Sequence, residues 1–174
     1  GNYAVSGGTL LPTTLAGISQ SSSGTSKLIF ATNGGTLDIN GLALTNTVTI
    51  SGSGDGSAGA LVNNGASQAN STMQVSMAGD ATVGGVFRMD LNNVSTVPGG
   101  LNGNGFNLTK VGTNCISLFN NSTNVFTNNL GNIAVNAGDL RIQNGSLLTI
   151  DPAKTITVAN GATLELNNLW IRAA

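Results

Sequence analysis

Three charged residues in the middle of the chain could do chemistry together: Asp80, Arg88 and Asp90. Paired carboxylates with a nearby cation are what the hydrolases and lyases of acidic polysaccharides need for acid–base work. If the segment from Ala81 to Phe87 contains a turn, the three side chains could meet at one corner of the fold. A surface ion pair explains the same residues with fewer assumptions. We therefore expect no catalytic residues and a protein that is not an enzyme.

The other chemically active residue types occur singly. Cys115 is the only cysteine, and because the chain has no histidine, no imidazole base is available to activate its thiol. We expect Cys115 to be a small buried hydrophobe. Asp55 lies in a Gly-rich turn similar to the corners of calcium-binding β-rolls, but Ca²⁺ takes about six to eight oxygen ligands. The sequence predicts no metal site and no cofactor.

The only tryptophan, Trp170, is the single large aromatic near the C-terminal end. An indole ring can stack on a sugar, which makes Trp170 a weak candidate for ligand binding. The alternative is that it plugs the end of the fold by covering the last apolar layer.

The amino-acid composition limits the classes of partner that we expect this chain to bind. The 174 residues include 6 Lys+Arg and 7 Asp+Glu, so the net charge is -1 and 7% of residues are charged, against about 25% in an ordinary domain. Polarity comes instead from 25 Gly, 24 Asn and 20 Thr. Nucleic-acid binding needs clusters of Lys and Arg, and membrane insertion needs about 18 uninterrupted apolar residues. We expect neither.

Short strands dominate the pattern, and no window shows the 3.6-residue periodicity of an amphipathic helix. Apolar–polar–apolar triplets, typical of strands with one buried face, are separated by seven Asn-Gly dipeptides that favour sharp turns. The predicted strands are centred on Leu28–Phe30, Leu37–Ile39, Val48–Ile50, Ala60–Val62, Met73–Val75, Val86–Phe87, Phe106–Leu108, Ile116–Leu118, Ile133–Val135, Leu140–Ile142, Ile156–Val158 and Leu164–Leu166.

Strands this short fit either an antiparallel sandwich or barrel, or a parallel β-helix. The β-helix is favoured because Gly138 and Gly161 open similar segments 23 residues apart, about one solenoid coil. The 4% aromatic content also suits a narrow coil interior better than a sandwich core. At about 22 residues per coil, the chain would make roughly seven or eight coils. Asn side chains at the corners could stack in ladders, each amide bonded to its equivalent in the next coil.

One stretch carries a more specific signature. Residues 105–114, together with Ile116–Leu118 and 135–140, resemble the autotransporter-associated β-strand repeat of bacterial surface proteins. The motif residues are Thr109, Lys110 and Gly112 of a Thr-Lys-x-Gly segment, and Gly138 and Leu140 of a Gly-x-Leu segment. The resemblance implies a right-handed parallel β-helix that forms part of a secreted passenger. Two features depart from the family: Cys115 replaces a polar residue, and no translocator barrel follows, so we expect the chain not to carry itself across an outer membrane. We expect Lys110 to cap a strand end at the surface.

These observations predict an all-β, right-handed parallel β-helix with a single domain over residues 1–174. Residues 1–26 would form an N-terminal coil or end segment, 27–166 the repeat region and 167–174 a C-terminal end segment. With no capping helix expected, the exposed coil edges would favour end-to-end self-association. We expect an extracellular or cell-surface stalk or fibre. Alternatives are an adhesin passenger that binds glycans or a partner protein through its loops, and a carbohydrate-active β-helix enzyme.

Overall fold

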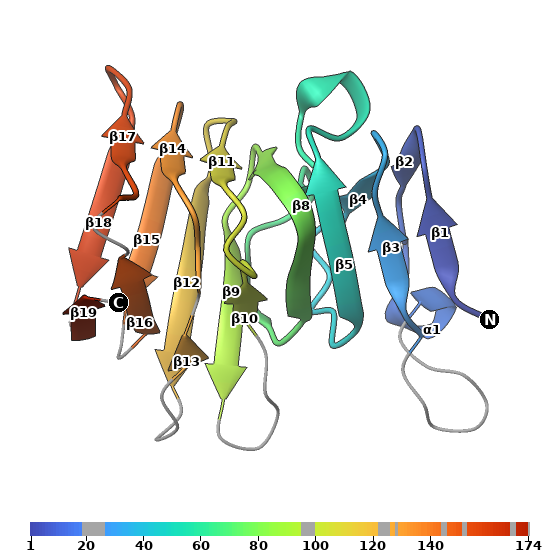
Figure 1. Ribbon diagram of the computed structural model, residues 1–174. Coiled ribbons are helices and arrows are strands. Elements are labelled where there is room, and N and C mark those ends of the chain that lie inside the picture. Colours follow the sequence, from blue (N-terminus) through green and yellow to red (C-terminus); the bar gives the residue numbers. More distant parts are fainter. Residues whose placement is uncertain are drawn as a thin grey trace.

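The computed structural model describes residues 1–18, 27–94, 100–121, 126–127, 129–143, 146–150, 153–167 and 170–173. It is an all-β solenoid, and all strand pairs in the described part of the chain are parallel. The coils stack from β1 at one end to β17, β18 and β19 at the other (Figure 1).

The strands stack in columns, which we call faces. The first face consists of β1 (Tyr3–Val5), β3 (Ile29–Ala31), β5 (Thr47–Gly52), the first part of β8 (Gln74–Gly85) and β10 (Gly100–Asn102). The second consists of β2 (Thr9–Leu10), β4 (Thr36–Asp38), β6 (Leu61–Asn63), the second part of β8, β11 (Leu108–Lys110), β14 (Ile133–Val135) and β17 (Ile156–Val158).

The third face is a separate five-stranded sheet. It consists of β7 (Gln68–Ser71), β9 (Met89–Val94), β12 (Cys115–Asn121), β15 (Asp139–Gln143) and β18 (Thr163–Asn167). A three-stranded sheet contains β13 (Phe126–Thr127), β16 (Ser146–Ile150) and β19 (Trp170–Ala173). The described helices are α1 (Leu15–Ile18) and the 3-10 turn η1 (Asp55–Ser57). No helix in the described part of the chain is long and apolar enough to cross a membrane.

The solenoid makes about five turns in which both the second and the third face carry a strand, so the expected seven or eight coils are wrong. Two features account for the difference. The third face begins only at β7, because the first two passes of the chain contribute strands to the first and second faces alone. Most coils are also longer than the 22 residues assumed: Leu108 pairs with Ile133, and Val83 pairs with Lys110, which is 27 residues further along the chain.

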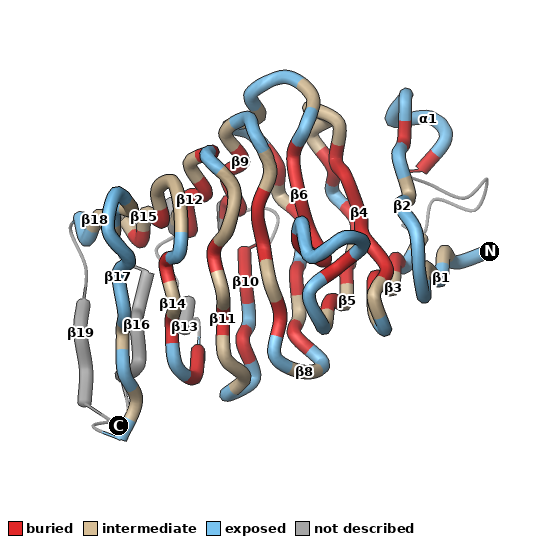
Figure 2. Tube along the Cα trace, turned by 90° about the horizontal axis from the view of Figure 1, so that it is seen from above, coloured by how far each residue is buried: buried red, intermediate tan, exposed pale blue. Residues whose placement is uncertain are grey.

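The core is a set of apolar rows that run along the solenoid axis. Each inward position stacks on its equivalent in the next coil, as in the row Met89, Ile116 and Leu140, all at most 1% exposed. The alternation seen in the sequence supplies these residues, because side chains two apart on a strand share one face. Figure 2 shows the buried residues concentrated in the strands of the middle coils, whereas β17 and β18 are largely exposed.

Three of the predicted Asn-Gly pairs form sharp turns with a left-handed backbone conformation. Asn33, Asn40 and Asn104 have φ values near +50°, and the glycine that follows each also has a positive φ. Asn and Gly tolerate this left-handed conformation better than other residues. One predicted strand is wrong: residues Val86–Phe87 form a turn. Strand β8 ends at Gly85, and the backbone N–H groups of Val86 and Phe87 both donate to the carbonyl of Asn63.

Candidate functional site

Lys110 is wholly buried, so the expectation of a surface lysine is wrong. It occupies an inward position of β11, between Val83 of the preceding coil and Val135 of the next. Burial lowers the pKa of its amine to about 8, although the acidic groups of Cys115 and Asp139 act in the opposite direction. The aliphatic stem therefore continues an apolar row of the core, while the amine needs polar partners inside the coil.

Three backbone carbonyls supply those partners. The Nζ atom of Lys110 donates to the oxygens of Val111 at 2.8 Å, Gly112 at 2.9 Å and Ala137 at 3.1 Å. Val111 and Gly112 belong to the turn after β11, whereas Ala137 belongs to the equivalent turn of the next coil. One ammonium group thus joins two successive turns of the solenoid.

The other motif residues lie in the same two coils as this lysine. Gly138 has a φ of +62°, and a Cβ atom there would lie 2.5 Å from the carbonyl oxygen of Asn114 and 2.6 Å from that of Gly112. Leu140 is fully buried on the third face, and Thr109 lies on the half-buried outward side of β11. Of these motif residues, Lys110 bonds two successive turns and Gly138 allows the turns to approach closely.

The three charged residues whose spacing could have allowed acid–base chemistry do not all meet. Arg88 and Asp90 form a two-point ion pair, with Nε to Oδ1 at 2.7 Å and Nη2 to Oδ2 at 2.6 Å. Asp80 lies elsewhere, exposed on β8, where it accepts hydrogen bonds at 2.9 Å from the backbone N–H and the Nδ2 of Asn107. These bonds lower the pKa of the Asp80 carboxyl. The separation arises because β8 continues through residues 81–85, so the chain turns only after Gly85.

Asp80 instead begins a ladder along one edge of the solenoid. The side-chain oxygen of Asp80 accepts the backbone N–H of Asn107, that of Asn107 accepts the N–H of Asn132 at 2.8 Å, and that of Asn132 accepts the N–H of Thr155 at 2.9 Å. We call these four residues the asparagine ladder. In its rungs, backbone N–H groups donate to side-chain oxygens, rather than side-chain amides bonding to one another as expected. The ladder ties four successive coils together.

The outward side of the third face carries a groove of about 330 Å³. We call it the polar groove. Its lining residues come from four neighbouring strands or the turn before β9 and are Ala69, Asn70, Arg88, Asp90, Asn92, Phe119 and Gln143. Strand register places Phe119 directly between Asn92 and Gln143. Sequence reasoning missed Asn92, Phe119 and Gln143, because the coil register that makes them neighbours is not visible in any local pattern.

Two lining residues are buried polar groups. Asp90 and Asn92 are 4% and 8% exposed. The Nδ2 of Asn92 donates to the carbonyl of Ala69 at 2.6 Å, but its Oδ1 accepts no hydrogen bond from the described residues. Asn46 and Asn114 show the same pattern, with Nδ2 bound to carbonyls and Oδ1 unpaired within the described part of the chain. Of the three asparagines, Asn92 is the one that lines the groove.

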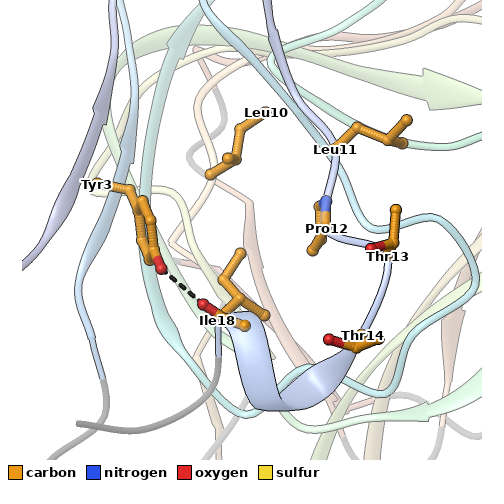
Figure 3. Close-up of a pocket in the computed structure, with 8 residues that line it drawn as sticks. Tyr3, Leu10, Leu11, Pro12, Thr13, Thr14 and Ile18 are labelled. Atoms are coloured by element: carbon orange, nitrogen blue, oxygen red, sulfur yellow. Dashed lines mark hydrogen bonds between the residues drawn. The ribbon is translucent and has the colours of Figure 1, made fainter.

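A second pocket, of about 230 Å³, lies at the N-terminal end (Figure 3). Leu10, Leu11, Pro12 and Ile18 surround it, and the hydroxyl of Tyr3 donates to the carbonyl of Gly17 at 2.7 Å. It is smaller than the roughly 300 Å³ of the smallest typical ligand sites. Its apolar lining and the short helix α1 close the first coil, where the third face has no strand. A short helix was not expected at this end.

The remaining candidate residues from the sequence are Cys115, Asp55 and Trp170. Cys115 is half-buried, and burial raises the pKa of its thiol. Asp55 is exposed in η1, where its carboxylate accepts a long bond of 3.4 Å from the hydroxyl of Thr9. The described residues contain no group of three or more His, Cys, Asp or Glu side chains that could hold a metal ion. Trp170 begins β19, but its side chain lies outside the described residues.

Comparison of the chain with protein-family models, with curated proteins and with solved structures finds no match in any of the three.

Proposed function

We propose that this chain is a non-enzymatic, extracellular structural β-helix that serves as a cell-surface stalk or as a subunit of a self-assembling fibre. The observation that carries the proposal is the unbroken parallel register of the second face, from β2 through β4, β6, β8, β11 and β14 to β17. Each coil is hydrogen-bonded to the next along the axis, which is the construction expected of a stiff rod.

Side chains reinforce the same axis. Lys110 joins two turns, and the asparagine ladder joins four coils along one edge. These links hold successive coils together along the solenoid axis, which is a structural rather than a catalytic role. The resemblance of the motif around Lys110 and Gly138 to bacterial surface repeats supports an extracellular location. A surface with few Lys and Arg residues also offers few cleavage sites to trypsin-like proteases outside the cell.

We infer that the solenoid is right-handed, because about 98% of crossovers between parallel strands of one sheet are right-handed.

The two ends favour head-to-tail association. Among the described strands, β1 and β2 at one end and β17 and β18 at the other have a neighbour on one side only. At the β17 end, Val158 and Leu166 continue the buried rows of Val135 and Ile142, yet they are 46% and 47% exposed. Leu11, at the opposite end, is 52% exposed. Stacking one end on the other would pair free strand edges and cover this apolar surface, which is a non-closing contact.

Negative-stain electron microscopy of the purified chain over a concentration series tests this proposal. We expect straight fibres of uniform width that lengthen with protein concentration. The double variant Val158→Lys/Leu166→Lys should abolish them, because charges on an edge strand oppose pairing. Phe87→Lys is the matched control, since Phe87 is 44% exposed on a lateral turn, and it should leave fibres intact.

Single short rods at every concentration would contradict the fibre and leave a stalk. Fibres that persist in the double variant would contradict assembly through these ends. The adhesin function is the second candidate, and the polar groove is the observation that favours it.

A further inference from the structure

We propose that the polar groove is a binding site for a neutral oligosaccharide. This site goes beyond the stalk or fibre function and does not depend on it. It rests on the adhesin candidate, to which it gives a ligand class, and it places the binding site on the sheet surface of the third face rather than in the loops.

The charge of the groove selects a neutral ligand. Its charged lining residues are Arg88 and Asp90, and they neutralise each other through two hydrogen bonds. Asp90 belongs to an outward row of side chains that also contains Arg141 and Glu165. These two residues form a second ion pair, with Nε of Arg141 2.8 Å from Oε2 of Glu165. In the first pair, Arg88 is the more exposed partner, with 41% of its side chain accessible against 5% for Asp90, but its Nε and Nη2 groups are already bonded to that carboxylate. A charged ligand would therefore find no uncompensated opposite charge in the groove.

The polar groups of the groove select hydroxyls. Asn70 and Gln143 each carry a hydrogen-bond donor and an acceptor side by side, and a sugar hydroxyl is likewise both donor and acceptor. One N–H of Gln143 is already used, since its Nε2 donates to the hydroxyl of Ser117 at 2.8 Å. Asn70 is exposed and Gln143 is half-buried, so a ligand can reach both of these amides, whereas Asn92 is buried. An apolar partner would cover the accessible amides without pairing them, at a cost in free energy. A hydroxyl-rich ligand supplies partners for them.

The aromatic ring in the lining of the groove is that of Phe119. Phe119 is half-buried on β12, between Asn92 on β9 and Gln143 on β15. Its exposed surface can pack against the C–H face of a sugar ring, while the flanking amides bond the ring hydroxyls. The lining spans four adjacent strands, β7, β9, β12 and β15, and hence three strand spacings of about 4.8 Å, or about 14 Å in all. A groove of that length accommodates a short oligosaccharide rather than one monosaccharide.

Titration of the ¹⁵N-labelled chain with three neutral probes tests the assignment: maltotriose, mannotriose and the trimer of N-acetylglucosamine. We expect at least one probe to shift the resonances of Asn92, Phe119 and Gln143 saturably. Phe119→Ala and Gln143→Ala should each raise Kd by about tenfold or more, through lost ring packing and lost amide bonds respectively.

Asn167→Ala is the matched control. Asn167 is in register with Gln143 on the next coil but lies outside the groove, so its removal should leave Kd unchanged within about twofold. Circular dichroism confirms folding of each variant, and Gln143→Ala carries the test if Phe119→Ala fails to fold.

Three results would overturn the assignment: no saturable shift with any neutral trimer, shifts that survive both groove variants, or binding of trigalacturonate alone. Absence of fibres in the microscope would contradict the fibre and leave this assignment unaffected.

Discussion

At the scale of single residues, Lys110 shows how a charged side chain can belong to the core. Its stem fills a row occupied by valines in the neighbouring coils, and its amine satisfies three carbonyls that no other described donor is shown to reach. We expect Lys110→Met to lower the free energy of unfolding at pH 7 by about 1–3 kcal/mol, because methionine keeps the packing but leaves the carbonyls without a donor. Urea denaturation measures the change.

The same variant reports the titration of the amine. The folded-state pKa of Lys110 is about 8, below the ordinary value of 10.5, so the unfolded state binds more protons between these two values. Stability from this group therefore rises as pH increases through that window, by up to about 3 kcal/mol in total. The difference in unfolding free energy between wild type and Lys110→Met should grow from pH 8 to pH 10.5.

A second lysine, Lys154, provides the control for the Lys110→Met experiment. Lys154→Met should change stability by less than about 0.5 kcal/mol at pH 7, because the side chain of Lys154 is only half-buried. A pH-independent difference for Lys110→Met would mean that the amine is solvated rather than buried.

At the scale of elements, the turns between the second and third faces decide how closely coils stack. Gly138 and Gly161 lie in equivalent turns and both have positive φ values, of +62° and +80°. A Cβ at Gly138 would collide with backbone oxygens of the preceding coil, whereas a Cβ at Gly161 meets nothing within 4 Å.

Substituting each glycine by alanine separates backbone strain from the clash. Gly161→Ala should cost about 1 kcal/mol, from the left-handed conformation alone. Gly138→Ala should cost about 3 kcal/mol or more, because the preceding coil has to move as well. Thermal or urea unfolding gives both values, and equal losses would show that close stacking at Gly138 contributes nothing.

At the scale of the whole molecule, a solenoid is held together by contacts between neighbouring coils, so its stability varies along the axis. Coils in the middle have neighbours on both sides, and their inward residues are almost fully buried. The end strands β17 and β18 expose Val158 and Leu166 instead.

Hydrogen exchange should report this gradient. We expect the slowest exchange in amides of β8, β9, β11 and β12, and the fastest in β2, β17 and β18, when the protein is dispersed. Assembly into fibres should protect the end strands selectively. Uniform protection along the dispersed chain would contradict a stack of coils stabilised by nearest neighbours.

Strand prediction succeeded where a strand carries its own alternation, as in Ile133–Val135 and Leu140–Ile142. It failed for polar strands such as Gln68–Ser71, which lacks an apolar triplet and is held by its pairing with β9. It also placed a strand at Val86–Phe87, where the apolar pair lies in a turn whose N–H groups bond to Asn63.

The sequence alone determined that this chain forms short strands joined by Asn-Gly turns and stacked as a parallel solenoid, because side-chain alternation and left-handed turn conformations depend on adjacent residues. Only the tertiary structure decided that Lys110 points inward, that Asp80 is separated from Arg88, and that Asn92, Phe119 and Gln143 line one groove. In a parallel solenoid, the lateral neighbour of a residue lies one coil away along the chain. The length of the coil and the strand register determine which residue is that neighbour. A change of one residue in either would turn the opposite face of the strand toward the core.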